Sequence, residues 1–504
     1  MSAKSEQVFV GAIDQGTSST RFLIFDVKGQ IVASHQCEYQ NYYAKAGWVE
    51  KDPSEILESV ETAVAGACRR FNSLGFEASQ IKSVGITNQR ETTVAFDVET
   101  GKPLTNAIIW NDVRTKDVVR RLIDEAGSAS RFAAINGLPI TTYFSAVKMR
   151  WMLENVGAVK EARERGTLRF GTIDTWLIYK LTGTYVTDVT NASRTMLMDL
   201  KTFKWSAECL DFFGVRESEL PEIRSSAEVY GTIGEGRLQG VPIAGCLGDQ
   251  QAAMVGQSCF EAGEAKNTYG TGCFMLFNTG DQPIFSKNGL LTTVGYQLGP
   301  DAVPKYALEG SIAVAGSAIQ WLRDKVGLVE AANEIGSLSD SVDDNGGVYF
   351  VTAFSGLFAP YWRDDARGCI VGLTQYATRG HIARATLESV CYQTRAILDA
   401  MRKDSGTDLR RLRVDGGMTN SDQAMQIQAD ILDIEVVRPE NRETTALGAA
   451  LAAGLGVGVW QNEAELRQIA QSNVSAFWSR ISSEKRDEML QGWEKAVERS
   501  YNWA

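Results

Sequence analysis

Residues 11–21 read GAIDQGTSSTR, in which an acid ends an apolar run and a turn of small, hydroxylated residues follows. Apolar runs at 8–14, 20–26 and 31–37 are short and separated by turn residues, which predicts three adjacent antiparallel strands. The backbone N–H groups and hydroxyls of the turn suit a bound phosphate. An ordinary hairpin with a Gly/Ser turn is the commoner explanation of such a stretch taken alone.

A helix and a further strand follow this hairpin. Asp52 suits an N-cap, Pro53 the first helical position and Glu55 the third, and the apolar run 81–87 returns as a strand. The order of strand, small-residue turn and strand recurs at 266–278, in residue types and not in residue identities. This recurrence predicts that the chain contains two related halves.

The length of the chain also favours two domains. A chain of 504 residues exceeds one ordinary domain. We place the boundary between 258 and 259, which gives an N-terminal domain over 1–258 and a C-terminal domain over 259–504. No low-complexity linker marks this boundary, so we expect the two lobes to pack closely.

Three turns are candidates for nucleotide binding. In the first, Asp14 can hold Mg²⁺ directly or through water, and Arg21 can offset phosphate charge. The turn 270–272 offers similar chemistry in the second half, and the glycines of 416–417 follow a short strand and an acid. For this third turn an ordinary strand-to-helix connection is about as probable, but three such turns in two halves favour a phosphate site.

The balance of charges argues against nucleic acid as a partner. Lys plus Arg total 51 and Asp plus Glu total 62, for a net charge of -11, whereas nucleic-acid and anionic-membrane binders show a basic surface. Eight cysteines form no CxxC pair, and two histidines exclude a histidine-rich metal site. The first residues lack the apolar core of a secretory signal, and no run of about 18 apolar residues occurs. We expect a cytoplasmic protein without a membrane span.

Several common nucleotide-binding signatures are absent. The chain has no G-x-x-x-x-G-K-[ST] loop, no His-Arg-Asp catalytic loop and no G-x-G-x-x-G fingerprint after a strand. A phosphotransferase with this sequence therefore uses another scaffold.

Two long segments carry a resemblance to a known family. The first, 143–155, reads YFSAVKMRWMLEN; the second begins with GCIVGL at 368–373 and continues after seven residues with HI at 381–382 and ATLE at 385–388. Both match the signature patterns of the FGGY carbohydrate kinases, and the likeness runs from about residue 9 to about residue 458. The resemblance implies an α/β fold of two actin-like (ribonuclease H-like) domains with a ligand cleft between them, and ATP with Mg²⁺ as cofactors.

Within that family, the pocket residues look like those of members that phosphorylate glycerol. The resemblance implies polyol-binding roles for Arg90, Glu91, Trp110, Tyr143, Asp249, Gln250 and Phe274. Together with the turn chemistry, it implies that the nucleotide is held by Asp14, Thr17, Ser18, Ser19, Arg21, Thr271, Gly316, Gln320, Gly417 and Ser421, with Asp14 at the metal. It also implies glycerol and MgATP as binding partners, and a homo-oligomer, dimer or tetramer.

One position departs from the family pattern. The family usually has an asparagine four residues past the second glycine of the Asp-Gly-Gly turn. Here Ser421 occupies that position and Asn420 precedes it, so either side chain can contact the nucleotide.

Asp249 has two explanations. The resemblance implies that it is the general base that accepts the proton of the attacking hydroxyl. Its ordinary pKa near 4 makes it a weak base, so alignment of the acceptor would be the larger task. The alternative is an aspartate that caps a helix starting at Gln250, and both roles can coexist.

Two other functions stay open at this point. A kinase of the same family with another sugar or polyol as substrate would keep the fold, although the pair Arg90–Glu91 and the two aromatic walls argue against it. A non-catalytic actin-like ATPase would keep the nucleotide turns but would need no polyol pocket.

Overall fold

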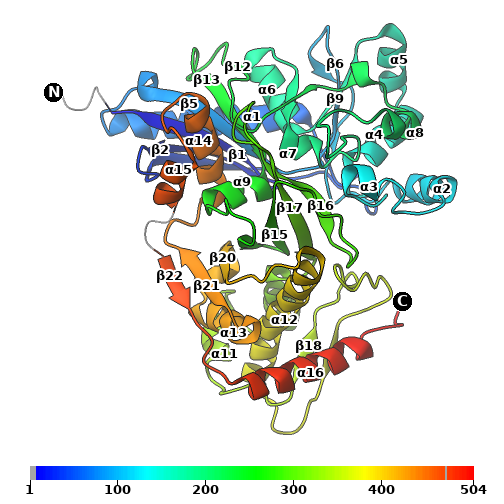
Figure 1. Cartoon of the computed structure of the whole chain (residues 1–504), viewed down its shortest axis with the longest axis vertical. Coiled ribbons are helices and arrows are strands. Elements are labelled where there is room, and N and C mark those ends of the chain that lie inside the picture. Colours follow the sequence, from blue (N-terminus) through cyan, green and yellow to red (C-terminus); the bar gives the residue numbers. More distant parts are fainter. Residues whose placement is uncertain (1–6, 471–473) are drawn as a thin grey trace.

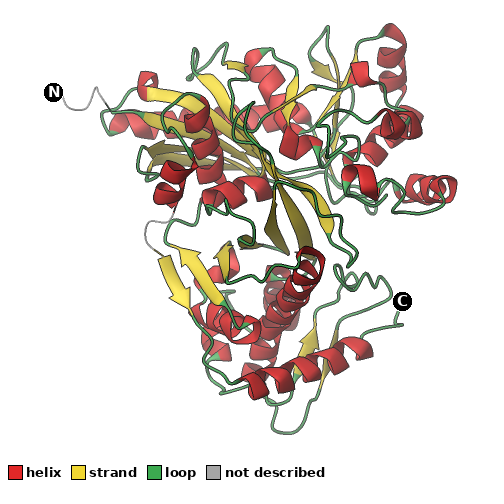
Figure 2. Ribbon diagram, in the orientation of Figure 1, coloured by secondary structure: helices red, strands yellow, loops and turns green. Residues whose placement is uncertain are grey.

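Two mixed sheets, one in each lobe, form the frame of the molecule (Figures 1 and 2). The computed structural model describes residues 7–470 and 474–504. The first sheet contains β1 (Phe9–Gln15), β2 (Ser19–Asp26), β3 (Ile31–Glu38), β5 (Ile81–Asn88), β12 (Gly231–Thr232) and β13 (Pro242–Gly248). Its order is β12-β13-β5-β1-β2-β3, with β1 antiparallel to β2 and parallel to β5. The three antiparallel strands predicted around residues 11–21 are therefore confirmed.

The second sheet repeats this arrangement. It contains β14 (Ala265–Tyr269), β15 (Cys273–Gly280), β16 (Leu291–Tyr296), β17 (Lys305–Ile312), β20 (Arg411–Asp415), β21 (Glu435–Pro439) and β22 (Val474–Phe477). The order β22-β21-β20-β14-β15-β17 matches β12-β13-β5-β1-β2-β3 strand for strand, in direction as well as in place, and β16 extends the edge. The prediction of two related halves is confirmed at the level of topology.

Helices surround and separate the two sheets. In the first half they are α1 (Pro53–Ser73), α2 (Lys116–Ala126), α3 (Ala133–Asn136), α4 (Ser145–Asn155), α5 (Gly157–Arg165), α6 (Ile173–Thr182), α7 (Val189–Ala192), α8 (Ala207–Phe213) and α9 (Asp249–Gly256). In the second half they are α10 (Gly316–Trp321), α11 (Glu334–Ser339), α12 (Arg379–Ser405), α13 (Asp422–Leu432), α14 (Thr444–Gly456), α15 (Glu463–Ala470) and α16 (Ser483–Arg499). The predicted start of α1 is confirmed, because the Asp52 carboxylate accepts a hydrogen bond from Ser54 N at 2.7 Å and Pro53 is the first helical residue.

Short strands complete the described elements. They are β4 (Glu50–Lys51), β6 (Val94–Asp97), β7 (Lys102–Pro103), β8 (Ala107–Ile108), β9 (Leu168–Gly171), β10 (Val186–Asp188), β11 (Glu222–Arg224), β18 (Tyr349–Val351) and β19 (Cys369–Val371). With α2, α4, α5 and α8, the small sheet β7-β6-β9 forms an outer part of the first lobe with its own apolar core (Figure 1). None of the helices in the described ranges combines the length and apolarity needed to cross a bilayer.

Alternation along β1 shows how the layers are built. Phe9 and Ile13 pack with α1 and α6 on one face of the first sheet, whereas Val10 and Ala12 pack with α14 on the other. The core that contains α14 also contains α9 and the inner faces of β15 and β17. The two sheets therefore share a middle layer made of two helices, one from each half of the chain.

The two middle helices cross at glycines. A Cβ on Gly256 of α9 would lie 1.9 Å from the carbonyl oxygen of Thr444, and a Cβ on Gly448 of α14 would lie 1.8 Å from that of Ala252. Only glycine permits backbones to approach so closely, and the close crossing fixes the position of both helices between the lobes.

Candidate active site

Three charged residues meet at the carboxyl ends of two parallel strands of the first sheet. Arg90 and Glu91 follow β5, and Asp249 follows the neighbouring β13 as the first residue of α9. The Arg90 Nε lies 3.3 Å from Asp249 Oδ1. Parallel strands bring their carboxyl ends to one edge of a sheet, which is why residues far apart in sequence share this edge.

Glu91 is held in an uncommon backbone conformation. Its φ is 59°, in the left-handed region that side-chain-bearing residues rarely adopt. Its carbonyl oxygen accepts hydrogen bonds from Ser145 Oγ at 3.1 Å, Lys148 Nζ at 3.1 Å and Thr93 Oγ1 at 3.0 Å. Two of these donors belong to the segment 143–155, so that segment fixes Glu91 at the cleft.

Arg90 is paired with a buried glutamate of the second lobe. Its Nη1 and Nη2 donate to Glu309 on β17, at 2.5 and 3.1 Å. Arg194 donates from Nη2 to the same Glu309 at 3.0 Å and from Nε to Glu91 at 2.6 Å. Burial would raise the pKa of Glu309, but the two guanidinium groups outweigh burial and lower it to about 2.

Aromatic rings face one another beside these charges. The ring centroid of Trp110 lies 5.7 Å from that of Tyr143 and 6.2 Å from that of Phe274, edge to face in both cases. Phe274 stands on β15 of the second lobe, whereas the other two rings come from the first. The predicted aromatic walls thus lie together, and both lobes contribute to the pocket.

The Trp110 ring also connects the pocket to the first phosphate turn. Its indole N–H donates to Thr17 Oγ1 at 3.0 Å. Asn41 donates to the Thr17 carbonyl at 3.1 Å, and Gly16 N donates to Ser19 O at 2.9 Å to close the turn. The turn is therefore fixed by the side chains of Trp110 and Asn41 and by a hydrogen bond within its own backbone.

Asp249 has the properties of a base at a half-open site. Its side chain is 32% exposed, and burial raises the pKa of its carboxyl to about 6, although Arg90 acts in the opposite direction. The helix begins at Asp249 itself, with Gly248 in the cap position, so the predicted cap on a helix starting at Gln250 is wrong by one residue. The Asp249 Oδ1 still accepts from Gln250 N at 2.8 Å.

Gln250 contacts a cation of the second lobe. Its side-chain oxygen accepts a hydrogen bond from Lys266 Nζ, which also donates to Thr268 Oγ1 at 3.0 Å. Burial lowers the pKa of Lys266 to about 8. This side of the pocket therefore carries a buried cation next to Asp249.

Asp14 and Arg21 form an ion pair at the end of the first hairpin. Arg21 lies 2.5 Å from Asp14 and 2.5 Å from Glu443. Mg²⁺ in nucleotide sites takes one or two carboxylates and fills its other positions with water and phosphate oxygens. The buried carboxylate of Asp14 at the carboxyl end of β1 fits that requirement, and in this structure it is paired with Arg21.

The predicted nucleotide residues of the second lobe line one cavity of about 650 Å³. The structure brings together there Thr271, Gly316, Gln320, Gly417 and Ser421. Asn420 lines it too, with its Oδ1 accepting from Arg442, while Ser421 Oγ caps α13 by accepting from Ala424 N at 3.2 Å. The predicted first-lobe residues Asp14, Thr17, Ser18, Ser19 and Arg21 are not part of this cavity.

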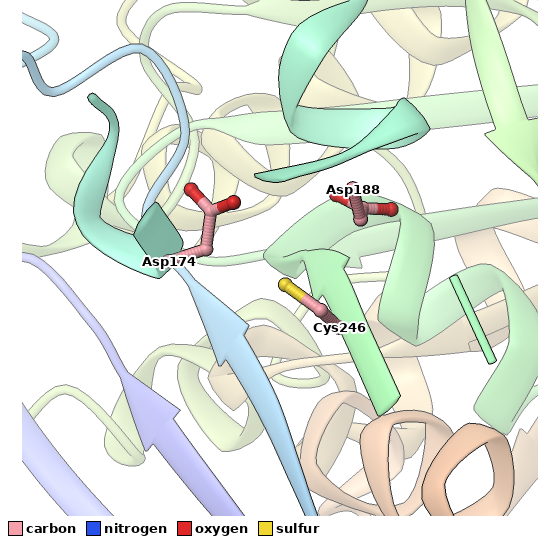
Figure 3. A group of neighbouring side chains, drawn as sticks. All are labelled: Asp174, Asp188 and Cys246. Atoms are coloured by element: carbon pink, nitrogen blue, oxygen red, sulfur yellow. The ribbon is translucent and has the colours of Figure 1, made fainter. Parts of the chain in front are cut away.

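A buried group of possible metal ligands lies elsewhere in the first lobe. Figure 3 shows Asp174, Asp188 and Cys246 turned toward one another. Thr172 and Thr187 hydroxyls donate to Asp174 at 2.5 and 2.6 Å. Asp188 receives hydrogen bonds from Thr190, Asn191 and Ser226 at 2.9 to 3.0 Å. Protein donors thus already satisfy these oxygens, and Thr190 Oγ1 in turn accepts from Gly248 N at 2.9 Å, just before Asp249.

Sequence reasoning missed three charged residues of the site. Arg194, Lys266 and Glu309 are each fully buried, and Lys266 stands on β14 (AKNTY) and Glu309 on β17 (KYALEGSI). For Lys266 the available signal was its place in the strand predicted at the start of 266–278, since a charge in a buried strand requires a partner, whereas no strand was predicted around Glu309.

The repeated sheet, the charged and aromatic residues that the two lobes bring together and the nucleotide-sized cavity define a two-domain α/β kinase of the actin-like class. Models of the FGGY family of carbohydrate kinases match residues 9–256 for the N-terminal domain and 265–457 for the C-terminal domain. The chain belongs to the FGGY family of carbohydrate kinases, which confirms the predicted family and fold.

Two relatives and one solved structure are similar to this chain over nearly its whole length. A glycerol kinase from Brucella anthropi is 54% identical over 501 residues, covering 98% of this chain and 99% of the relative. A glycerol kinase from Pseudarthrobacter chlorophenolicus is 54% identical with 98% of each chain covered. Among solved structures, Plasmodium falciparum glycerol kinase with ADP superposes with a TM-score of 0.92 at 39% identity, with 98% of each chain covered.

Proposed function

We propose that the chain is an ATP-dependent glycerol kinase that transfers the γ-phosphoryl group of MgATP to a terminal hydroxyl of glycerol, giving sn-glycerol 3-phosphate. The observation that carries the proposal is 54% identity to glycerol kinases over nearly the whole chain. The site agrees with it, because charged hydrogen-bonding groups lie beside two aromatic rings that meet edge to face, and a small polyol requires polar groups together with an apolar surface.

In this mechanism Asp249 is the general base. Its carboxylate accepts the proton of the attacking hydroxyl late in the transfer, and its pKa of about 6 leaves it ionised at neutral pH. Arg90 and Glu91 bind the other hydroxyls of glycerol, Tyr143 adds a hydroxyl contact, and Gln250 completes the polar side. Trp110 and Phe274 cover the carbon chain and exclude water.

The nucleotide occupies the second-lobe cavity and reaches toward the first-lobe turn. Gly316, Gln320, Gly417 and Ser421 contact the nucleoside side, whereas Thr271 and the turn 17–19 contact the phosphates. Asp14 would hold Mg²⁺, which would neutralise charge on the transferring phosphoryl group, and Arg21, now paired with Asp14, would offset phosphate charge.

Three further features belong to the same proposal. We infer a cytoplasmic homo-oligomer, dimer or tetramer, with functional domains at 1–258 and 259–504. Family resemblance supports the assembly, and the matched family segments lie on either side of the proposed boundary. Sedimentation equilibrium of the purified chain tests the assembly, and a single species at the mass of one chain would contradict it.

The first experiment measures ADP release by the purified protein with MgATP, with glycerol, xylulose, ribulose, gluconate or no acceptor. We expect strong dependence on glycerol. A preference for one of the sugars would keep the nucleotide site and overturn the polyol assignment. Hydrolysis that is independent of acceptor would move the chain to the non-catalytic actin-like class.

A further inference from the structure

Glu309 is an acidic side chain of the second lobe that links two arginines of the first lobe, Arg90 and Arg194. Its Oε2 accepts from Arg90 Nη1 at 2.5 Å, and its Oε1 accepts from Arg90 Nη2 at 3.1 Å and from Arg194 Nη2 at 3.0 Å. All three side chains are at most 2% exposed. With Glu91, which Arg194 contacts at 2.6 Å, they form a buried cluster of two positive and two negative charges.

The cluster crosses from one lobe to the other at a place where the lobes are tightly joined. Glu309 stands on β17, and the neighbouring β16 contributes Thr293, whose hydroxyl lies 2.8 Å from Ser193 Oγ of the first lobe. Gln251 of α9 donates to Val294 O at 3.2 Å in the same region. Glu309 is therefore fixed relative to Arg90 by contacts that lie outside the cluster.

We propose that Glu309 is a positioning residue for the polyol, a second-lobe anion that holds Arg90 in the orientation in which it binds a glycerol hydroxyl. This inference rests on the proposed function. Arg90 has three anions within reach: Glu309, which it contacts through both terminal nitrogens, Asp249, 3.3 Å from its Nε, and Glu91, 4.0 Å from its Nε. The fork on Glu309 holds both terminal nitrogens of Arg90, so that only its Nε faces Asp249.

The electrostatics of the cluster keep Glu309 negatively charged. Because the pKa of Glu309 is lowered to about 2, its charge persists over any working pH. Removing that charge leaves two buried guanidinium groups facing one carboxylate of Glu91, so Arg90 turns toward Asp249. The polyol then loses a fixed donor, whereas the nucleotide, bound in a separate cavity, does not.

The test compares Glu309→Gln, Glu309→Asp and the control Glu219→Gln. Glu219 is also a buried glutamate paired with an arginine, Arg163 at 2.8 Å, but it lies in the outer part of the first lobe. For Glu309→Gln we expect the glycerol KM to rise on the order of 100-fold and the MgATP KM to change less than about threefold. Glu309→Asp keeps the charge and recovers part of the loss, and Glu219→Gln leaves both KM values unchanged.

Inhibition by deoxy analogues of glycerol is a second measurement. A general loss of stability in the variant does not change the relative inhibition constants of two analogues. The inhibition constants of 1,2-propanediol and 1,3-propanediol against glycerol are measured for wild type and Glu309→Gln. One of the two diols lacks the hydroxyl that Arg90 binds. We expect the inhibition constant of that diol to be the same in wild type and Glu309→Gln, and the inhibition constant of the other diol to be higher in Glu309→Gln. Equal weakening of glycerol and both diols, or equal effects on the glycerol and MgATP KM values, would overturn the inference.

The outcomes also separate this inference from the function on which it rests. A wild-type protein without glycerol-dependent ADP release refutes the proposed function itself. A glycerol-dependent wild type with an unchanged glycerol KM in Glu309→Gln refutes only the positioning role. If Glu309→Gln does not fold, Glu309→Asp decides the matter, because its shorter arm still raises the glycerol KM several-fold and spares the MgATP KM.

Discussion

The two lobes share six strands in the same order and directions, but they place different residues at the start of the equivalent middle helices. Helix α9 follows β13 and begins with Asp249, whose side chain is 32% exposed. Helix α14 follows β21 and begins with Thr444, whose hydroxyl donates to Asp415 within its own lobe. A duplicated scaffold thus provides two equivalent helix starts, and only one of them begins with an aspartate, the residue proposed as the base.

The largest difference between the lobes should appear when these two helix starts are changed. We expect Asp249→Asn to lower kcat by about 10³-fold with little change in glycerol binding, because the base is lost and the pocket is kept. Thr444→Val, the matched change in the second lobe, should lower kcat by less than about tenfold. Steady-state kinetics check both, and near-normal turnover in Asp249→Asn would remove Asp249 from the base role.

The second prediction concerns the glycines that let the helices of the two lobes cross. Gly448→Val places side-chain atoms against the backbone of Ala252, so we expect the free energy of unfolding to fall by more than about 3 kcal/mol. Gly157→Ala is the control, since a Cβ there meets nothing within 4 Å and the effect should stay below about 1 kcal/mol. Denaturant unfolding measures both, and equal losses would show that the crossing does not depend on glycine.

The pH dependence sharpens the contrast because the proposed base, Asp249, lies in the first lobe. With the pKa of Asp249 at about 6, kcat/KM should fall about tenfold for each pH unit below 6. The raised pKa also means that ionisation destabilises the fold as pH rises through 6, so Asp249→Asn should melt higher than wild type above that pH. A pH–rate profile with its acid limb near pH 4 would contradict the assignment.

The smallest predicted difference lies between the two hairpin turns. A Cβ on Gly272 would lie 2.3 Å from Ile312 O, whereas one on Gly16 would lie 3.3 Å from Ser19 O. We therefore expect Gly272→Ala to raise the MgATP KM about tenfold and Gly16→Ala to raise it less than about threefold. Initial rates at varied MgATP measure this, and the reverse order would show that the first turn is the more constrained one.

Local patterns allowed much of the fold to be predicted. The Asp52 cap, the hairpin at 11–21 and the repeated turn at 270–272 depend on residues close in sequence, and the structure has all three. The placement of the α9 start was off by one residue, because a helix start depends on backbone geometry that residue type only biases.

The ion cluster could not be predicted in the same way. Arg90 and Glu309 are 219 residues apart, and Arg194 and Glu309 are 115 apart. A charge in a strand is usually assigned to the solvent face, and only the packing of one lobe against the other shows that these three side chains satisfy one another. The roles assigned to the predicted pocket residues stay predictions until the variants above are measured.

Helix α14 has a consequence for how the chain is made. It belongs to the second half of the sequence, yet it covers the face of the first sheet that carries Val10 and Ala12. During synthesis that face stays uncovered until Gly456 has left the ribosome, long after the last strand of the sheet has emerged. Part of the core of the nascent first domain therefore stays exposed until α14 has been synthesised. A chain stalled before Thr444 would expose an apolar surface to which chaperones bind.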